Sequence, residues 1–151
     1  MDVEARLEEL GIKLPDVVPP VAAYVPAVRS GNQVWTSGQL PMVDGSMPAT
    51  GKVGADVTAE AAKGLARLCA LNALAAVRAE LGGSLSSTVR VVKVVGFVAS
   101  APDFTGQPGV VNGASEVLGE IFGSPHARSA VGVASLPLDA PVEVEIVVEV
   151  D

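Results

Sequence analysis

The pattern of apolar and polar positions predicts two long helices, each burying one broad face. Apolar residues recur with helical spacing over residues 58–81. Asp56 or Thr58 can cap the start of this helix, and Gly82-Gly83 ends it. A second helix is expected over 108–122, although its three glycines weaken it unless packing there requires a close approach.

Valine-dense or alternating segments predict the strands. They lie at 22–28, 34–39, 89–99, 127–134 and 142–150. Between the first two strands, residues 29–33 have the composition of a hairpin turn. The resulting order, β-β-α-β-α-β-β, indicates an α+β fold in which both helices cover one face of a mixed sheet.

An additional segment precedes this pattern. Residues 2–10 predict a short helix, and the proline-rich residues 14–20 predict an extended arm, with a disordered tail as the alternative. We therefore divide the chain into an N-terminal helix and arm over 1–21 and a single domain over 22–151.

The composition limits what this domain can bind. Apolar residues make up 49% of the 151 positions but aromatic residues only 3%, so the core is expected to consist of Ala, Val and Leu. A core with few large side chains can gain stability by oligomerising. The net charge of −7 argues against nucleic-acid partners and against an anionic membrane surface, because both need a basic face. A small anion in one local pocket remains compatible with this charge.

The rare residue types exclude several kinds of site and segment. One cysteine cannot form an internal disulfide, and one cysteine with one histidine cannot make an ordinary zinc site. The charged N-terminal segment is unlike a signal peptide, and no apolar run approaches the roughly 18 residues of a membrane span. We therefore expect a cytoplasmic protein.

The strongest candidate chemistry lies in the last third of the chain. Arg128 stands at the head of an apolar strand, and Glu143 and Glu145 alternate along the final strand. A buried guanidinium needs an anionic partner, which is either a substrate carboxylate or one of these glutamates across the strands. A carboxylate nearby could handle a water molecule or a proton. An arginine beside a glutamate could thus bind and hydrolyse a small acid.

Two motifs in this order resemble the Rid family of reactive intermediate deaminases, also called the YjgF family. They are Thr36-Ser37-Gly38-Gln39-Leu40-Pro41 upstream, and Ala127-Arg128-Ser129, Leu136-Pro137 and Val142-Glu143-Val144 downstream. Asn72 and Asn112 also fit, and the resemblance covers roughly residues 22–150. It implies a chorismate-mutase-like fold, assembled as a homotrimeric barrel with active sites between subunits.

The implied reaction is hydrolysis of 2-imino acids and enamines, such as 2-aminoacrylate, to 2-keto acids and ammonia, without metal or organic cofactor. By the resemblance, Arg128 holds the substrate carboxylate and Glu143 orients the attacking water. Pocket-lining positions are matched by Tyr24, Ser37, Gly38, Asn112 and Ala130. The last of these is often a cysteine in the family.

One more departure from the family pattern concerns the position two before the arginine. It is usually proline or alanine, whereas here it is His126, for which a surface or interface role is the alternative to a functional one.

Other functions fit the same resemblance. A non-catalytic module could use the Arg128 pocket to bind a small carboxylate. RNA cleavage is disfavoured by the acidic composition. Chorismate mutase activity would need several cations around a dicarboxylate, and among the matched pocket positions Arg128 is the one clear cation.

Overall fold

The computed structural model describes residues 2–20 and 22–151, so Met1 and Val21 of the predicted N-terminal extension lie outside the described residues. The elements in chain order are α1 (Val3–Glu9), β1 (Ala27–Ser30), β2 (Gln33–Thr36), α2 (Ala59–Glu80), β3 (Thr88–Ala99), α3 (Gln107–Phe122), β4 (Ala127–Val133), a 3-10 turn (Pro137–Asp139) and β5 (Val142–Val150). Within these described ranges, no helix has the length and apolar character needed to cross a bilayer.

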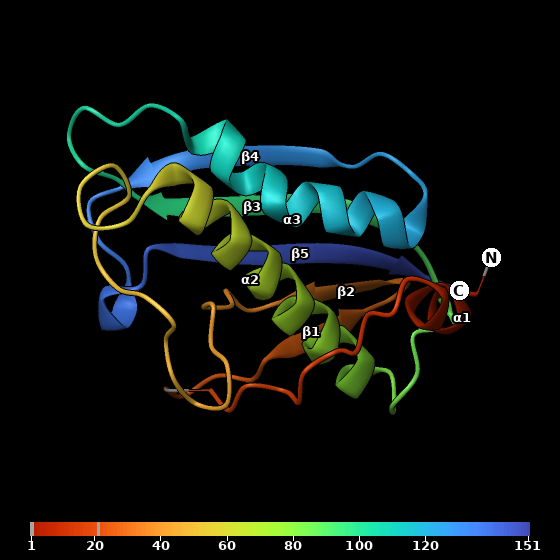
Figure 1. Cartoon of the computed structure of the whole chain (residues 1–151). Helices are drawn as coiled ribbons and strands as arrows, with labels where there is room; N and C mark the ends of the chain where they lie inside the picture. The colour runs from red at the N-terminus through yellow and green to blue at the C-terminus, as the bar shows by residue number, and fades with distance from the viewer. Residues whose placement is uncertain (1, 21) are drawn as a thin grey trace.

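The five strands form one mixed sheet in the order β1-β2-β5-β3-β4. All neighbours are antiparallel except β3 and β4, which are parallel and joined through α3. Both long helices lie side by side on one face of this sheet (Figure 1). The predicted α+β class, the mixed sheet and the placement of the helices are therefore confirmed.

The first long helix, α2, begins and ends where the sequence signals predict. Thr58 caps α2, because its hydroxyl accepts a hydrogen bond from the backbone N–H of Ala61 at 3.1 Å. The helix ends before Gly82, whose positive φ of 84° suits glycine. Asn72, a buried polar residue of α2, donates to the carbonyls of Leu40 and Met42 at 2.9 and 3.1 Å. Both amide hydrogens therefore have partners, as a buried amide requires.

The predicted extent of the first strand is wrong. It was expected at 22–28, but β1 begins at Ala27, and Tyr24 lies in the irregular segment before it. Pro26 explains the difference, because proline has no N–H with which to continue the ladder. The connection to β2 is also shorter than 29–33, since only Gly31 and Asn32 separate the two strands and Gly31 takes the positive φ of 60°.

The second strand is likewise shorter than the predicted 34–39, because a bulge interrupts its pairing with β5. Trp35 pairs with Val147, and Gln39 pairs with Val144 through hydrogen bonds of 2.8 and 3.0 Å. Between these pairs, three residues (36–38) face the two residues 145–146 of β5. One extra residue therefore sits on the β2 side, which bends the chain there.

The core between helices and sheet consists mainly of small aliphatic side chains. Val94 and Val98 of β3 and Ile146 of β5 meet Leu74 of α2 and Leu118 of α3. Glycines allow a closer approach than alanine would. A Cβ added at Gly113 of α3 would collide with the Lys63 carbonyl of α2, and one at Gly96 of β3 would lie 2.5 Å from a Val111 methyl.

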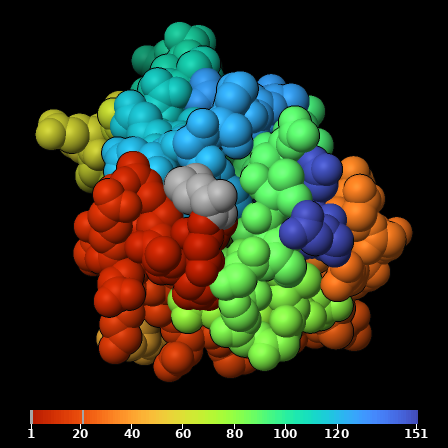
Figure 2. Space-filling view, turned by 90° about the vertical axis from the view of Figure 1, so that its right-hand side faces the viewer, coloured from red at the N-terminus to blue at the C-terminus, as the bar shows by residue number. Residues whose placement is uncertain are grey.

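The N-terminal helix joins the same core. Val3 and Leu7 of α1 and Leu14 of the arm are buried in it. The Arg6 Nε donates to the Glu120 carbonyl of α3 at 3.0 Å, and the Glu4 carboxylate accepts from the Leu85 N–H at 2.9 Å. Figure 2 shows this N-terminal segment, in red, lying against the green segment that follows α2.

We expect Gly113→Ala to lower the free energy of unfolding by about 1–3 kcal/mol, the usual cost of overpacking. Its Cβ would press against the backbone of Lys63, with the carbonyl carbon 2.8 Å away. Denaturant titration measures the loss. The matched control is Gly119→Ala in the same helix, where nothing lies within 4 Å of the new methyl. The control should be neutral or stabilise by up to about 1 kcal/mol, and equal losses in both variants would contradict the close helix contact.

Candidate functional site

The predicted arginine is held by the second long helix. Arg128 pairs with Val94 on β3, a fully buried residue under the helices, so its side chain points toward α3. Its Nη1 donates to Asn112 Oδ1 at 2.7 Å and to Ser115 Oγ at 3.3 Å. Asn112 and Ser115 are three residues apart and therefore share one side of the helix.

His126 completes this group, which we call the arginine cluster: Asn112, Ser115, His126 and Arg128. The His126 Nε2 and the Ser115 Oγ share a hydrogen bond of 2.9 Å. Ala130 stands two positions after Arg128 on the same face of β4, beside Gly96. The structure therefore brings three predicted positions, Asn112, Arg128 and Ala130, to one side of the sheet.

The remaining predicted residues gather elsewhere, in a group that we call the glutamate cluster: Tyr24, Ser37, Gly38 and Glu143. Gly38 lies in the bulge and packs against Glu143, since a Cβ there would sit 2.7 Å from the carboxyl carbon. Ser37 fixes this segment, with its Oγ donating to the Val25 carbonyl at 2.6 Å.

A hollow of about 30 Å³ opens between Tyr24 and Gly38, and the arm residues Val18, Pro19 and Pro20 line its other side. The N-terminal arm therefore borders the glutamate cluster.

The two clusters lie on opposite faces of the sheet within one chain. Glu143 pairs with Phe97 on β3, whose side chain alternates with the buried Val98 and so points away from the helices. Strand β3 also separates β5 from β4, which places Glu143 and Arg128 roughly 10 Å apart laterally, or two strand spacings. The expectation of an arginine beside a glutamate is therefore not met inside a single chain.

Arg128 also makes no salt bridge with Glu143 or Glu145, the alternative left open by the sequence. Among the described residues, its hydrogen-bond partners are both on α3.

Comparison with known proteins places the chain in a family. The family model described as Endoribonuclease L-PSP matches residues 15–150. Protein TCP17 of Trypanosoma cruzi is 46% identical over 99% of this chain and 94% of its own length. A 2-iminobutanoate/2-iminopropanoate deaminase of Escherichia coli is 34% identical over 84% of this chain and 87% of its own.

Two solved structures agree. Protein Atu1372 of Agrobacterium tumefaciens, of unknown function, is 50% identical with a TM-score of 0.89, covering 99% of this chain and 92% of that one. The E. coli YjgF gene product is 29% identical with a TM-score of 0.66, covering 89% of this chain and 93% of that one. The chain belongs to the YjgF/Rid family. The resemblance drawn from the motifs around Ser37 and Arg128 is thus confirmed.

In this Rid protein the carboxyl groups of Glu143 and Glu145 lie in an environment that favours protonation. Burial, and next the charge of Glu145 two positions along the same face, raise the pKa of Glu143. Burial also raises the pKa of Glu145. Within the described part of the chain, no group donates a hydrogen bond to the Glu143 carboxylate, so its oxygens remain available.

In the arginine cluster the pKa shift runs in the opposite direction. Burial, and next the charge of Arg128, lower the pKa of His126, which keeps its imidazole neutral near pH 7. Ser115 was not predicted from the sequence. Its spacing of three from Asn112 in a helix was the available signal, but serine alone is too common to indicate a site.

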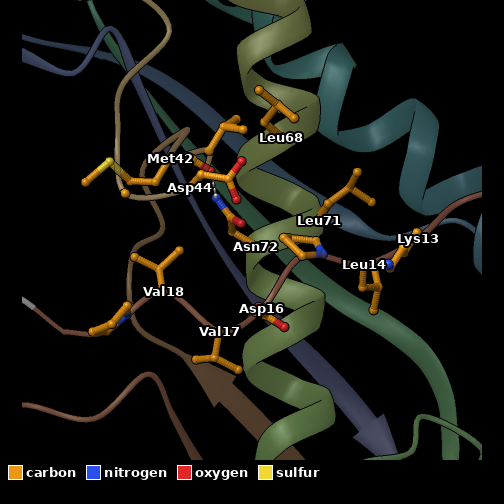
Figure 3. A pocket seen from close by; sticks show the side chains of 14 residues that line it. Lys13, Leu14, Asp16, Val17, Val18, Met42, Asp44, Leu68, Leu71 and Asn72 are labelled. Atoms are coloured by element: carbon orange, nitrogen blue, oxygen red, sulfur yellow. Dashed lines mark hydrogen bonds between the residues drawn. The ribbon is translucent and has the colours of Figure 1, made fainter.

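A larger cavity of about 510 Å³ adjoins the hollow beside the glutamate cluster, because Val18, Pro19 and Met42 line both. None of the eight cluster residues lines this cavity itself. Figure 3 shows it between the arm residues Lys13 and Asp16, the loop residues Met42 and Asp44, and Leu68 of α2. Among the described residues, no three His, Cys, Asp or Glu side chains converge as a metal site requires.

Glu143→Gln should raise the unfolding temperature at neutral pH. Because the pKa of Glu143 is raised in the folded state, the folded protein binds this proton more tightly than the unfolded chain does. The resulting stabilisation is present below the unfolded-state pKa and is lost as the pH rises through the folded-state pKa. The advantage of the variant should therefore shrink toward about pH 4.

Calorimetric unfolding across this pH range measures the effect. The control is Glu149→Gln on the same strand, because Glu149 forms a 2.8 Å ion pair with Arg90. The control should give no gain. A Glu143→Gln protein less stable than wild type at pH 7 would contradict the unpaired carboxylate.

Proposed function

We propose that this protein hydrolyses small 2-imino acids and their enamine tautomers, such as 2-aminoacrylate, to 2-keto acids and ammonia. The active site would lie between neighbouring subunits of a homotrimer. The observation that carries this proposal is the arginine cluster, in which neutral groups hold Arg128 and no described carboxylate neutralises it. A guanidinium held in this way is prepared for a carboxylate from outside the chain.

The free edge of the guanidinium sets how the substrate would bind. Both hydrogen bonds that Arg128 donates to described residues use Nη1. Nε and Nη2 then offer two parallel N–H groups, which match the two oxygens of a carboxylate. Ala130 follows two residues later on the same face, beside Gly96.

Glu143 supplies the second half of the reaction. Water attacks the electrophilic imine carbon, and the Glu143 carboxylate accepts the proton that the water loses. That proton passes to the former imine nitrogen and gives the neutral carbinolamine. Glu143 then transfers the remaining hydroxyl proton to the same nitrogen, so that the C–N bond breaks, ammonia leaves and the C=O bond of the keto acid forms. A raised pKa for Glu143 favours this exchange near neutral pH. Positioning the imine against the water supplies much of the remaining rate increase.

Two features support an assembly in which subunits share sites. The clusters lie on opposite faces of one sheet, so a second copy is needed to bring them together. The face away from the helices also exposes large apolar side chains, with Val28 and Trp35 54% and 53% accessible. Three such faces would cover one another in a chorismate-mutase-like barrel with the helices outside.

One of the two relatives described above supports this chemistry by its name. The E. coli relative is named as a 2-iminobutanoate/2-iminopropanoate deaminase, whereas the more similar TCP17 has a name without an activity. The endoribonuclease description of the family fits less well, because a net charge of −7 opposes RNA phosphates.

We expect Arg128→Ala to reduce kcat/KM for imine hydrolysis by roughly 10- to 100-fold, the value of a charge-assisted hydrogen bond. The assay generates imines in situ with an amino-acid oxidase and follows keto-acid release. The control is Arg67→Ala on the exposed surface of α2, which should behave as wild type. Ligand-dependent thermal stabilisation without turnover would instead indicate a carboxylate-binding module.

Mixing two inactive variants tests the shared site. Arg128→Ala and Glu143→Gln each damage one cluster, so each homotrimer contains no intact pair. In a random 1:1 mixture after subunit exchange, about a quarter of the interfaces would combine two intact clusters. We therefore expect activity to return to roughly that fraction of wild type.

The control mixes each variant with itself under the same exchange conditions and should stay inactive. If the mixed sample also stays inactive while light scattering shows exchanged trimers, the two clusters do not work together across an interface.

A further inference from the structure

His126 is the single histidine of the chain and stands two positions before Arg128, at the entrance of β4. Its Nε2 lies 2.9 Å from Ser115 Oγ, and the same oxygen accepts a hydrogen bond from Arg128 Nη1 at 3.3 Å. One hydroxyl thus connects an imidazole to the guanidinium that would bind the substrate.

We propose that His126 is a positioning residue for the substrate carboxylate, acting through Ser115 to fix the plane of the Arg128 guanidinium. This role rests on the proposed function of Arg128 as the carboxylate ligand and extends it to two residues that the family motifs do not include. His126 itself need not touch the substrate.

The geometry explains how the connection works. The two hydrogens of Nη1 go to different acceptors, Asn112 Oδ1 at 2.7 Å and Ser115 Oγ at 3.3 Å, and so orient the planar fork. A serine hydroxyl rotates freely unless a second hydrogen bond holds it. The His126 ring supplies that bond through Nε2 at 2.9 Å, while its Nδ1 is buried without a hydrogen-bond partner among the described residues. The guanidinium therefore keeps Nε and Nη2 directed outward.

The groups around the His126 ring keep the imidazole uncharged at neutral pH, so that it does not repel Arg128. Arg128 on β4 is the charged group facing it, and this charge together with burial lowers the pKa of His126. The two acidic residues of α3 line a groove between α2 and α3 instead. Glu116 forms an ion pair there with Lys63 at 3.1 Å, and Glu120 lines the same groove. Lys93 of β3 neighbours Ala127 on the opposite face of the sheet.

Carboxylate binding and His126 protonation should consequently be coupled. A bound carboxylate offsets the charge of Arg128, which raises the pKa of His126. By linkage, lowering the pH through that pKa tightens carboxylate binding by the same factor.

The kinetic test compares His126→Ala, Ser115→Ala and the double variant. We expect His126→Ala to raise KM by roughly 2- to 10-fold, the value of one hydrogen bond, with kcat little changed. In the Ser115→Ala background the same substitution should have almost no further effect, since the connection is already broken. His126→Gln, whose Nε2 can reach the position of the imidazole Nε2, should restore most of the loss at pH 7. Ser135→Ala, in the exposed loop after β4, is the control.

A second measurement needs no turnover. NMR titration of the lone imidazole, with 2-oxobutanoate as the carboxylate probe, reports the pKa of His126 directly. We expect the probe to raise that pKa in wild type and to leave it unchanged in Arg128→Ala.

The two measurements separate the proposals. If the probe raises the pKa and binds more weakly to His126→Ala, but no imine is hydrolysed, the positioning role stands and the deaminase function fails. If imines are hydrolysed but His126→Ala and Ser115→Ala act additively or lower kcat alone, the positioning role is overturned. A probe that neither binds nor moves the pKa overturns it as well.

Discussion

Strand β3 pairs with β5 on one side and with β4 on the other, and the register of these two ladders decides which way Arg128, Ala130 and Glu143 point. Side chains alternate along a strand, so a shift of one residue would exchange the faces. In the observed register Val94 neighbours both Arg128 and Ile146, which puts the guanidinium under α3. Glu143 neighbours Phe97 and emerges on the opposite face. The division into two clusters follows directly from this pairing.

Small residues make the rest of this arrangement possible. Without side chains at Gly96 and Gly113, β3 can approach α3 and α3 can approach α2 more closely than alanine would allow. The close fit holds Asn112 and Ser115 at hydrogen-bonding distance from Arg128. A core of alanine and valine therefore gives up large hydrophobic contacts and gains short distances between backbones.

The sequence predicted well the parts of the fold that depend on local signals. The Thr58 cap, the end of α2 before Gly82 and the valine-rich β3 follow from the residues themselves. The first two strands were misjudged because Pro26 and the bulge at 36–38 interrupt ladders whose partners lie far along the chain. Arg128 and Glu143 could be selected as candidates by residue type and motif. Their separation could not be predicted, because the face of each strand depends on long-range register, and Ser115 became visible only through its contacts.

The opposite placement of the two clusters has a consequence for how activity would respond to the amount of protein. In the proposed trimer, folding of one chain completes neither carboxylate binding nor water activation, so a newly made subunit is inert until it meets others. Specific activity would then depend on concentration, falling on dilution below the dissociation constant of the assembly even while each subunit keeps its fold. Such an enzyme would become active only once its concentration is high enough for the subunits to assemble.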